Sequence, residues 1–204
     1  MAKKTTARGV VDAAEHAAAH LDALGVGYAL IGGLAVAARA EPRYTRDVDL
    51  AVSVARDEEA EQLLHALTSR GYTIDTVVEQ TRTGRLATAR LRHRKDPAVF
   101  VDLLFSSSGI EPEVVEAAER VVYRRGTDLP VARVGYLMAL KVLSESDARL
   151  QDRIDLRALA SVARKGDWST AEDAVRLIRA RGYHRGRALL RRLRRWRRTV
   201  TSPK

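Results

Sequence analysis

The chain has 204 residues, 46% of them hydrophobic, which is enough for one substantial domain or for a compact domain with a small helical one. It contains no cysteine, so a disulfide framework and a thiolate metal site are excluded. The first residues carry no apolar segment after their lysines, and no stretch approaches the ~20 apolar residues of a membrane span. We therefore expect a soluble, cytoplasmic protein with no membrane partner.

The net charge of +10 is unevenly distributed along the chain. Residues 174–204 contain eleven Arg and one Lys but no acidic residue, which is a charge of +12. The preceding 173 residues carry 24 basic and 26 acidic residues, which is a charge of −2. A near-neutral body with one strongly basic end favours a polyanionic partner. The alternative is a solvated, arginine-rich helix without a partner.

Helix and strand signals alternate in the first half of the chain. Helical spacing closed by glycines such as Gly25 and Gly71 predicts helices over residues 10–24, 34–40 and 57–69, with Asp57 as an N-cap. Apolar runs and alternating apolar residues predict strands over residues 28–31, 48–54, 73–78, 86–91 and 99–105. The segments 81–84 and 94–97 have the composition of hairpin turns.

Beyond about residue 111 the pattern becomes mostly helical. Helices are predicted over residues 112–119, 135–146, 150–164, 169–180 and 184–198, and Ser169 and Glu172 have capping-box spacing. Residues 121–123 and 131–133 are candidates for brief edge strands. The expected fold class is α+β. An N-terminal domain over residues 1–110 holds a mixed β-sheet flanked by helices, and residues 111–204 form a mainly helical part with a basic terminal helix.

Two aspartates stand two residues apart on the strand predicted at 48–54. Because side chains alternate between the faces of a strand, Asp47 and Asp49 leave the same face, while Val48 and Leu50 point into the core. Two like charges about 6–7 Å apart on one face repel each other, so the arrangement favours a bound cation. Carboxylate oxygens are hard ligands, which indicates Mg²⁺ or Mn²⁺.

A third aspartate, Asp102, lies in the otherwise apolar strand predicted at 99–105. A lone carboxylate in such a strand is costly to bury unless it is paired or bound to metal. If this strand lies beside the strand of Asp47, three carboxylates converge and can bridge two metal ions for in-line nucleotidyl transfer. The alternatives are an acidic surface strand for the first pair and a capped edge residue for Asp102.

The pair Gly32-Gly33 follows a predicted buried strand and precedes a short helix. Glycine allows close approach of the backbone, and a helix N-terminus offers N–H groups to an anion, which suits the phosphates of a nucleotide. The alternative is a simple strand-to-helix turn. Arg43 and Arg46 flank the strand of the aspartate pair and can neutralise phosphates or remain ordinary surface charges.

The order of Gly32-Gly33, then Thr45-Arg46-Asp47-Val48-Asp49-Leu50, then a strand with Asp102 resembles the polymerase-β-type nucleotidyltransferase superfamily. Leu140-Lys141 followed by Gln151-Asp152-Arg153-Ile154-Asp155-Leu156 resembles its AbiEii abortive-infection branch. The resemblance extends over residues 28–159. One position departs from the pattern, because many members have Ser after the glycine pair and this chain has Leu34.

The resemblance implies a domain that transfers a nucleoside monophosphate from an NTP to a hydroxyl group. It implies that Asp47, Asp49 and Asp102 hold the metal, that Asp102 also acts as the base, and that Lys141 contacts the triphosphate. Nucleotide-binding residues would be Gly32, Gly33, Thr45, Arg46 and Lys141. Asp152 and Asp155 are expected to orient Lys141 or Arg149, and the alternative for Lys141 is a lysine snorkelling from an apolar helix.

Members of this branch are toxins of bacterial toxin–antitoxin pairs, and some resemble enzymes that modify tRNA. The resemblance therefore implies an RNA acceptor, with tRNA foremost, and a cognate antitoxin protein as a further partner. The basic terminal helix fits such an acceptor, because arginines on one helix neutralise phosphates. The predicted RNA-binding residues are Arg185, Arg187, Arg191, Arg194, Arg195 and Arg198. Trp196 has the spacing of an apolar seam that packs on the body rather than of a base-stacking residue.

Two other functions remain open at this stage. A nucleotidyltransferase for a small molecule of the aminoglycoside type would use the same carboxylates, but its polycationic substrate would need an acidic pocket. A non-catalytic nucleic-acid-binding module of the same fold would not need three retained aspartates.

Overall fold

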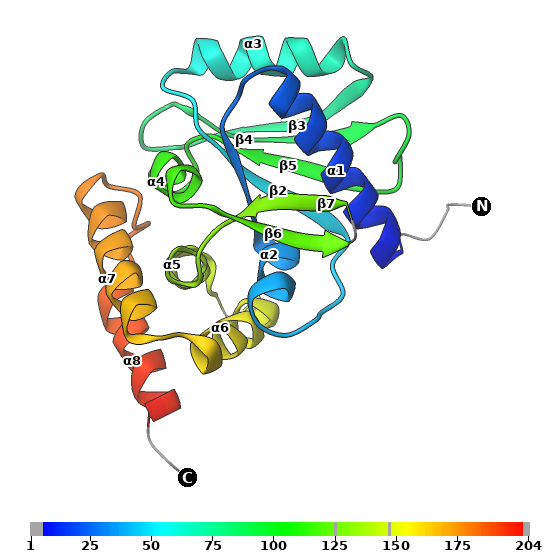
Figure 1. The fold of residues 1–204 in the computed structure, drawn as a ribbon. Coiled ribbons are helices and arrows are strands. Elements are labelled where there is room, and N and C mark those ends of the chain that lie inside the picture. Colours follow the sequence, from blue (N-terminus) through cyan, green and yellow to red (C-terminus); the bar gives the residue numbers. More distant parts are fainter. Residues whose placement is uncertain (1–5, 125, 147, 202–204) are drawn as a thin grey trace.

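The computed structural model describes residues 6–124, 126–146 and 148–201 (Figure 1). The described residues form a mixed seven-stranded sheet with the strand order β3-β4-β5-β2-β1-β7-β6. The strands are β1 (Tyr28–Ile31), β2 (Asp47–Val52), β3 (Tyr72–Glu79), β4 (Leu86–His93), β5 (Phe100–Leu104), β6 (Glu119–Arg124) and β7 (Thr127–Val131). The fold is α+β, as the sequence predicts.

Strand β2 lies at the centre of the sheet. It pairs antiparallel with β1 and parallel with β5, and β4 pairs antiparallel with the other side of β5. The predicted hairpin turns after β3 and β4 are both present. Within β2, Val48 and Leu50 are buried whereas Asp47 and Asp49 are partly exposed, so the alternation predicts the orientation of this strand correctly.

The described helices are α1 (Ala7–Ala23), α2 (Gly32–Arg39), α3 (Asp57–Thr68), α4 (Glu111–Glu116), α5 (Val134–Ser144), α6 (Leu150–Val162), α7 (Lys165–Ala180) and α8 (Leu189–Thr201). Helix α1 packs on the sheet through an alanine-rich stripe, in contact with β2, β5 and β7 (Figure 1). Helix α5 has almost only apolar residues, because it packs against α2, α6, α7 and α8 at once. No helix among the described residues is long and apolar enough to cross a bilayer.

The sheet draws strands from both sides of the boundary predicted at residues 110 and 111. Of the two segments expected as brief edge strands, β6 is the edge strand, whereas β7 is an inner strand that lies between β6 and β1 and pairs parallel with β1 through Leu30 and Val131. The purely helical part begins only at α5. Local signals do not reveal this arrangement, because the pairing of β7 with β1 joins residues about a hundred positions apart in the sequence.

Two predicted helix starts, those of α7 and α8, are off by four or five residues, and one predicted cap is wrong. Helix α7 begins at Lys165 rather than Ser169, because the Asp167 carboxylate accepts a hydrogen bond from the Arg164 N–H and closes the first turn earlier. Helix α8 begins at Leu189 rather than residue 184, because Gly182, Arg185 and Gly186 adopt positive φ angles. Asp57 does not cap α3 but accepts hydrogen bonds from Arg85 and from the backbone N–H of Leu86.

Candidate active site

The three aspartates come together where β2 and β5 run side by side. Asp49 is the direct register partner of Asp102, and Asp47 is the partner of Phe100. Neighbouring strands lie about 4.8 Å apart, so Asp49 and Asp102 are adjacent and Asp47 lies one diagonal step away on the same face. The structure therefore brings together the carboxylates that the sequence places on two separate strands.

The crowding of these carboxylates changes their acidity. Burial, followed by the negative charge of Asp102, raises the pKa of Asp49 to about 6, against a smaller opposing effect of Lys141. Burial also raises the pKa of Asp47, where the charges of Arg90 and Asp102 act in opposite directions. Repulsion between desolvated carboxylates is relieved by a cation. The three side chains together offer hard oxygen donors of the kind that Mg²⁺ and Mn²⁺ prefer, so they fit a divalent metal site.

The glycine pair at the start of α2 lies against the Asp49 carboxylate. Gly32 has a φ of +61°, and a Cβ atom at this position would come within 1.9 Å of Asp49 Oδ2. The Gly33 N–H donates a hydrogen bond to the Asp49 carboxylate. A Cβ atom on Gly33 would also lie 2.6 Å from Thr45 Oγ1. Glycine is therefore required at both positions, because the carboxylate strand and the loop before it approach the backbone of the first helical turn.

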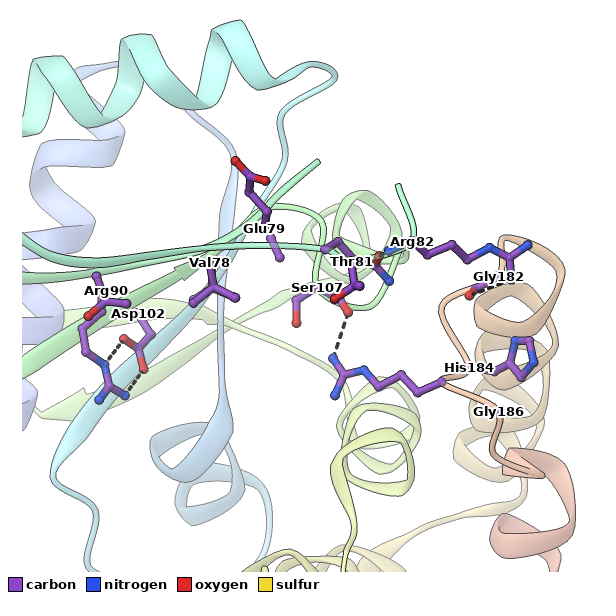
Figure 2. A pocket seen from close by; sticks show the side chains of 15 residues that line it. Val78, Glu79, Thr81, Arg82, Arg90, Asp102, Ser107, Gly182, His184 and Gly186 are labelled. Carbon is purple, nitrogen blue, oxygen red and sulfur yellow. Dashed lines mark hydrogen bonds and ion pairs between the residues drawn. The ribbon is translucent and has the colours of Figure 1, made fainter. Parts of the chain in front are cut away.

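Arg90 on β4 is a site residue that the sequence analysis missed. Its Nε and Nη2 atoms donate hydrogen bonds of 2.8 and 2.7 Å to the two oxygens of Asp102 (Figure 2). Arg90 is also the register partner of Asp102 across β4 and β5, and its guanidinium lies 4.8 Å from the centre of the Phe100 ring. The alternation of Thr88, Arg90 and Arg92 along β4 is the only sequence signal for this contact. It has no meaning until the strand register is known.

Lys141 projects from α5 toward two buried carboxylates on α6. Its Nζ atom lies 2.8 Å from Asp152 Oδ1 and 2.7 Å from Asp155 Oδ2. Arg43 Nε lies 3.0 Å from Asp155 Oδ1, so Asp155 joins two cations. The expectation that these two aspartates orient Lys141 agrees with this geometry, whereas Arg43 is a paired, half-buried residue rather than an ordinary surface charge. The snorkelling alternative for Lys141 does not hold, because its side chain is only 14% exposed.

The two residues before the aspartate pair differ from each other. Thr45 Oγ1 donates a hydrogen bond of 3.3 Å to the Asp47 carbonyl oxygen and lies beside Gly33. Arg46 is exposed, and its guanidinium lies 5.9 Å from the centre of the Tyr44 ring. Neither residue lines the cavity described next, so the predicted roles of Thr45 and Arg46 in nucleotide binding gain no support from the geometry. An arginine next to the aspartate pair can contact a phosphate only if its side chain leaves the strand on the face that lines the cavity.

Two connected depressions meet at Asp102. A cavity of about 320 Å³ lies over the carboxylates and is lined by Gly32, Gly33, Arg43, Asp49, Lys141, Arg149 and Asp152, among others. A groove of about 900 Å³ opens beside it, between the β3–β4 hairpin and the segment that joins α7 to α8 (Figure 2). Thr88, Asp102, Ser107 and Arg185 line both depressions. Asp102 therefore stands at the junction of a small acidic and basic cavity with a larger groove.

The predicted RNA-binding arginines fall into two groups. Arg185 lines the groove, and its Nη2 donates to the Ser107 carbonyl oxygen at 3.1 Å. A second depression between α7 and α8 is lined by Arg176, Arg179, Arg191, Arg194 and Arg198. Arg187 lines this depression as well, although its Nη1 atom donates to the carbonyl oxygens of Leu143 and Glu145 at the end of α5.

The other side of α8 serves the fold. Leu189 and Leu193 are buried, and Trp196 packs against the core, so the prediction of an apolar seam is confirmed. Arg195 lies 3.6 Å from the carboxylate of Glu145, a side chain that is only 2% exposed. Part of the basic excess therefore neutralises a buried acid instead of facing solvent.

Solved structures with the same overall fold include several nucleotidyltransferases. An antigenic nucleotidyltransferase-like protein from Paracoccidioides brasiliensis is 20% identical, with a TM-score of 0.54, over 93% of this chain and 94% of that chain. ANT(2″)-Ia in complex with adenylyl-2″-tobramycin is 16% identical, with a TM-score of 0.53, over 84% of this chain and 97% of that chain. MenT4, a nucleotidyltransferase toxin from Mycobacterium tuberculosis, is 18% identical, with a TM-score of 0.50, over 81% of this chain and 62% of that chain.

These likenesses concern the fold, since all are at or below 20% identity. No curated protein matches the sequence at a significant level. The sequence itself matches the family model described as the nucleotidyl transferase AbiEii toxin of a Type IV toxin–antitoxin system, over residues 17–202. Because this match covers nearly the whole chain, including every residue of the carboxylate cavity, the chain belongs to the AbiEii family of toxin nucleotidyltransferases.

Proposed function

We propose that this enzyme transfers a nucleoside monophosphate from an NTP to a hydroxyl group of RNA, with tRNA as the foremost acceptor. The observation that carries the proposal is the position of Asp102, which lines both the carboxylate cavity and the adjoining groove. In this arrangement the cavity holds the triphosphate and the groove holds the acceptor. The two reactants then meet at the carboxylate that stands between them.

The carboxylates have separate tasks in this scheme. Asp47, Asp49 and Asp102 would hold divalent metal, which supplies Lewis-acid stabilisation of the phosphate charge when bound. Asp102 accepts the proton of the attacking hydroxyl, while the new bond to the α-phosphorus forms and pyrophosphate departs. Arg90 leaves Asp102 competent for this role, because its two hydrogen bonds occupy one lone pair on each oxygen and each oxygen has another.

The basic residues of the cavity bind and orient the triphosphate. Lys141 has three N–H donors, and the two directed at Asp152 and Asp155 leave one for a phosphate oxygen. The paired aspartates also hold the long lysine side chain in one conformation, which lowers the entropic cost of binding. Arg149 lines the same cavity and adds positive charge. Gly32 and Gly33 line the same cavity.

The groove and the α7–α8 surface favour RNA over a polycationic small molecule. The groove is lined by Arg82, Arg90 and Arg185, with Glu79 and Asp102 as its acids, so cations predominate. The depression with Arg176, Arg179, Arg191, Arg194 and Arg198 continues the positive surface along α7 and α8 through His184 and Gly186, which line both depressions. Arg187 also lines this depression, with its Nη1 atom held at the end of α5. The family description also leads us to propose a cognate antitoxin as a partner.

The experiment is to incubate the protein with each labelled NTP and Mg²⁺, together with either total tRNA or an aminoglycoside mixture. We expect label on tRNA, dependence on divalent metal, and no labelled aminoglycoside. Asp49→Asn tests the site, and Glu58→Gln, which removes one exposed acid on α3, is the matched control. Label on aminoglycoside alone would replace RNA by a small-molecule acceptor. Absence of any transfer by the folded protein would contradict the proposal.

A further inference from the structure

A cluster of histidines lies away from the carboxylate cavity, where α1 meets the turn between β4 and β5. His16 on α1, His93 at the end of β4 and Asp96 in the turn each offer a ligand atom within 4.8 Å of the other two. His16 Nδ1 lies 2.6 Å from Asp96 Oδ2, and His93 Nδ1 lies 3.9 Å from the same oxygen. None of these residues lines the carboxylate cavity or the groove.

The hydrogen bonds around His93 define which ring nitrogen carries its proton. His93 Nε2 lies 3.1 Å from the Arg70 carbonyl oxygen, which can only accept, so Nε2 is the donor. The Lys95 N–H points at His93 Nδ1 from 3.4 Å, which assigns the lone pair to Nδ1. That lone pair faces the Asp96 carboxylate. A ring nitrogen oriented through a bond from its other nitrogen to a backbone carbonyl is the arrangement of metal-binding histidines.

The separations suit one tetrahedral ion. Ligand atoms about 2.1 Å from a tetrahedral zinc ion are about 3.4 Å from one another. The His93–Asp96 separation of 3.9 Å is close to this value, and the His16–Asp96 contact of 2.6 Å must open by under an ångström. His16 can make this adjustment because its side chain is 39% exposed, while His93 and Asp96 are 4% and 14% exposed. The ion would thus bind at a prearranged pair and recruit a more mobile third ligand.

The surroundings of the cluster favour a nitrogen-binding metal over Mg²⁺. The His93 ring packs against Tyr72 at 4.7 Å and against His20 at 5.5 Å between ring centres, so the site is enclosed on that side. Two imidazoles and one carboxylate form a donor set typical of zinc, whereas Mg²⁺ prefers oxygen ligands and several waters. His16 and His20 stand one helical turn apart, so both rings reach the same end of the sheet.

We propose that His16, His93 and Asp96 form a zinc-binding site that fastens α1 to the β4–β5 turn. Water would complete the coordination on the exposed side of His16. The site does not depend on the proposed acceptor or on the metal at the aspartates. Its consequence is structural: zinc binds the folded state and so stabilises the contact between the N-terminal helix and the sheet.

The test is equilibrium dialysis of the full chain against Zn²⁺ in excess Mg²⁺, with metal measured by mass spectrometry, and Co²⁺ absorption as a probe of tetrahedral geometry. We expect one Zn²⁺ per chain. His16→Ala and Asp96→Asn should each weaken binding at least tenfold, since even the partners of ligands contribute ten- to a hundredfold. Zinc should also raise the melting temperature of the parent protein but not of His16→Ala.

Two controls separate this site from others. His65→Ala removes an exposed histidine on α3, and Asp49→Asn removes a carboxylate of the cavity. Both should retain the zinc stoichiometry and the Co²⁺ spectrum. If the parent protein binds no zinc, if His16→Ala binds as tightly as the parent, or if binding is lost only in Asp49→Asn, the proposal is overturned.

Discussion

Asp47, Asp49 and Asp102 stand on two adjacent strands and leave the same face of the sheet, whereas the arginines of α8 are distributed along a mostly exposed helix. Both regions concentrate like charges. Burial and the negative charge of Asp102 raise the pKa values of Asp47 and Asp49, so the repulsion among these carboxylates is strong and directed at one point. Most α8 arginines are exposed to solvent and spread along the helix, so their mutual repulsion is screened.

The comparison also divides α8 itself. Arg191, Arg194 and Arg198 line an open depression, whereas Arg192 and Arg195 contact the carbonyl or carboxylate oxygens of Glu145. A dense basic sequence therefore contains both a surface for a polyanion and internal partners for a buried acid. Desolvated charges that converge on one point indicate a catalytic or metal-binding site. Exposed charges spread along a helix indicate a surface that binds a polyanion. The following predictions test each side of this distinction.

The largest effect is expected at the carboxylates. Asp49→Asn removes a charge that holds the metal, and the metal is expected to stabilise the transition state by several kcal/mol. Nucleotide transfer should therefore fall at least about 100-fold. The fold should persist, because the variant also relieves carboxylate repulsion. Transfer rates and circular dichroism of the variant and of Glu58→Gln check this. Full activity in Asp49→Asn would remove the carboxylates from the mechanism.

The next effect concerns the exposed arginines. Replacing Arg191, Arg194 and Arg198 by Gln should weaken tRNA binding about tenfold or more, and the slope of log affinity against log salt should decrease by about 2 to 3. A variant with Arg8, Arg56, Arg120 and Lys165 replaced by Gln changes the net charge by at least as much elsewhere on the surface and serves as the control. Equal affinity and equal salt slope in the parent and the threefold variant would reduce α8 to a solvated helix.

The arginines on the inward side of α8 should affect the stability of the protein rather than its binding of RNA. The Glu145 carboxylate lies 3.4 Å from Arg153, 3.6 Å from Arg195 and 3.8 Å from Arg192. Glu145→Gln should lower the free energy of unfolding by about 1–2 kcal/mol, a value reduced because these arginines are partly exposed. Urea unfolding measures it, and Asp173→Asn, which removes an exposed acid paired with Arg176, is the control that should change stability less than Glu145→Gln does. A larger loss in the control than in Glu145→Gln would reverse the assignment.

The smallest effect is a pH dependence of the metal-free protein. The pKa of Asp49 is raised to about 6 in the folded state, so between pH 4 and 6 the folded chain holds a proton that the unfolded chain has released. This contribution to the free energy of unfolding therefore increases as the pH falls from 7 to 5, by about 1 kcal/mol. Urea unfolding with a chelator at both pH values should show the increase in the parent and not in Asp49→Asn. An identical pH response in both proteins would contradict a raised pKa.

The sequence alone determined the alternation of Asp47 and Asp49 with Val48 and Leu50, because the two-residue period of a strand is a local property. It also determined the close backbone approach that Gly32 and Gly33 allow at the start of α2, the apolar seam of α8 and the family motif. Helix starts were less predictable. In α7, for example, Asp167 closes the first turn, although Ser169 and Glu172 have the spacing of a capping box.

Only the tertiary structure decided which charges meet. The pairing of Asp49 with Asp102 depends on the register of β2 and β5, and Arg90 reaches Asp102 only because β4 lies on the other side of β5. The histidines of α1 reach His93 across more than seventy positions of sequence. Such contacts follow from packing between distant segments. A hydrophobic pattern specifies which side of each element is buried, but not which neighbour covers it.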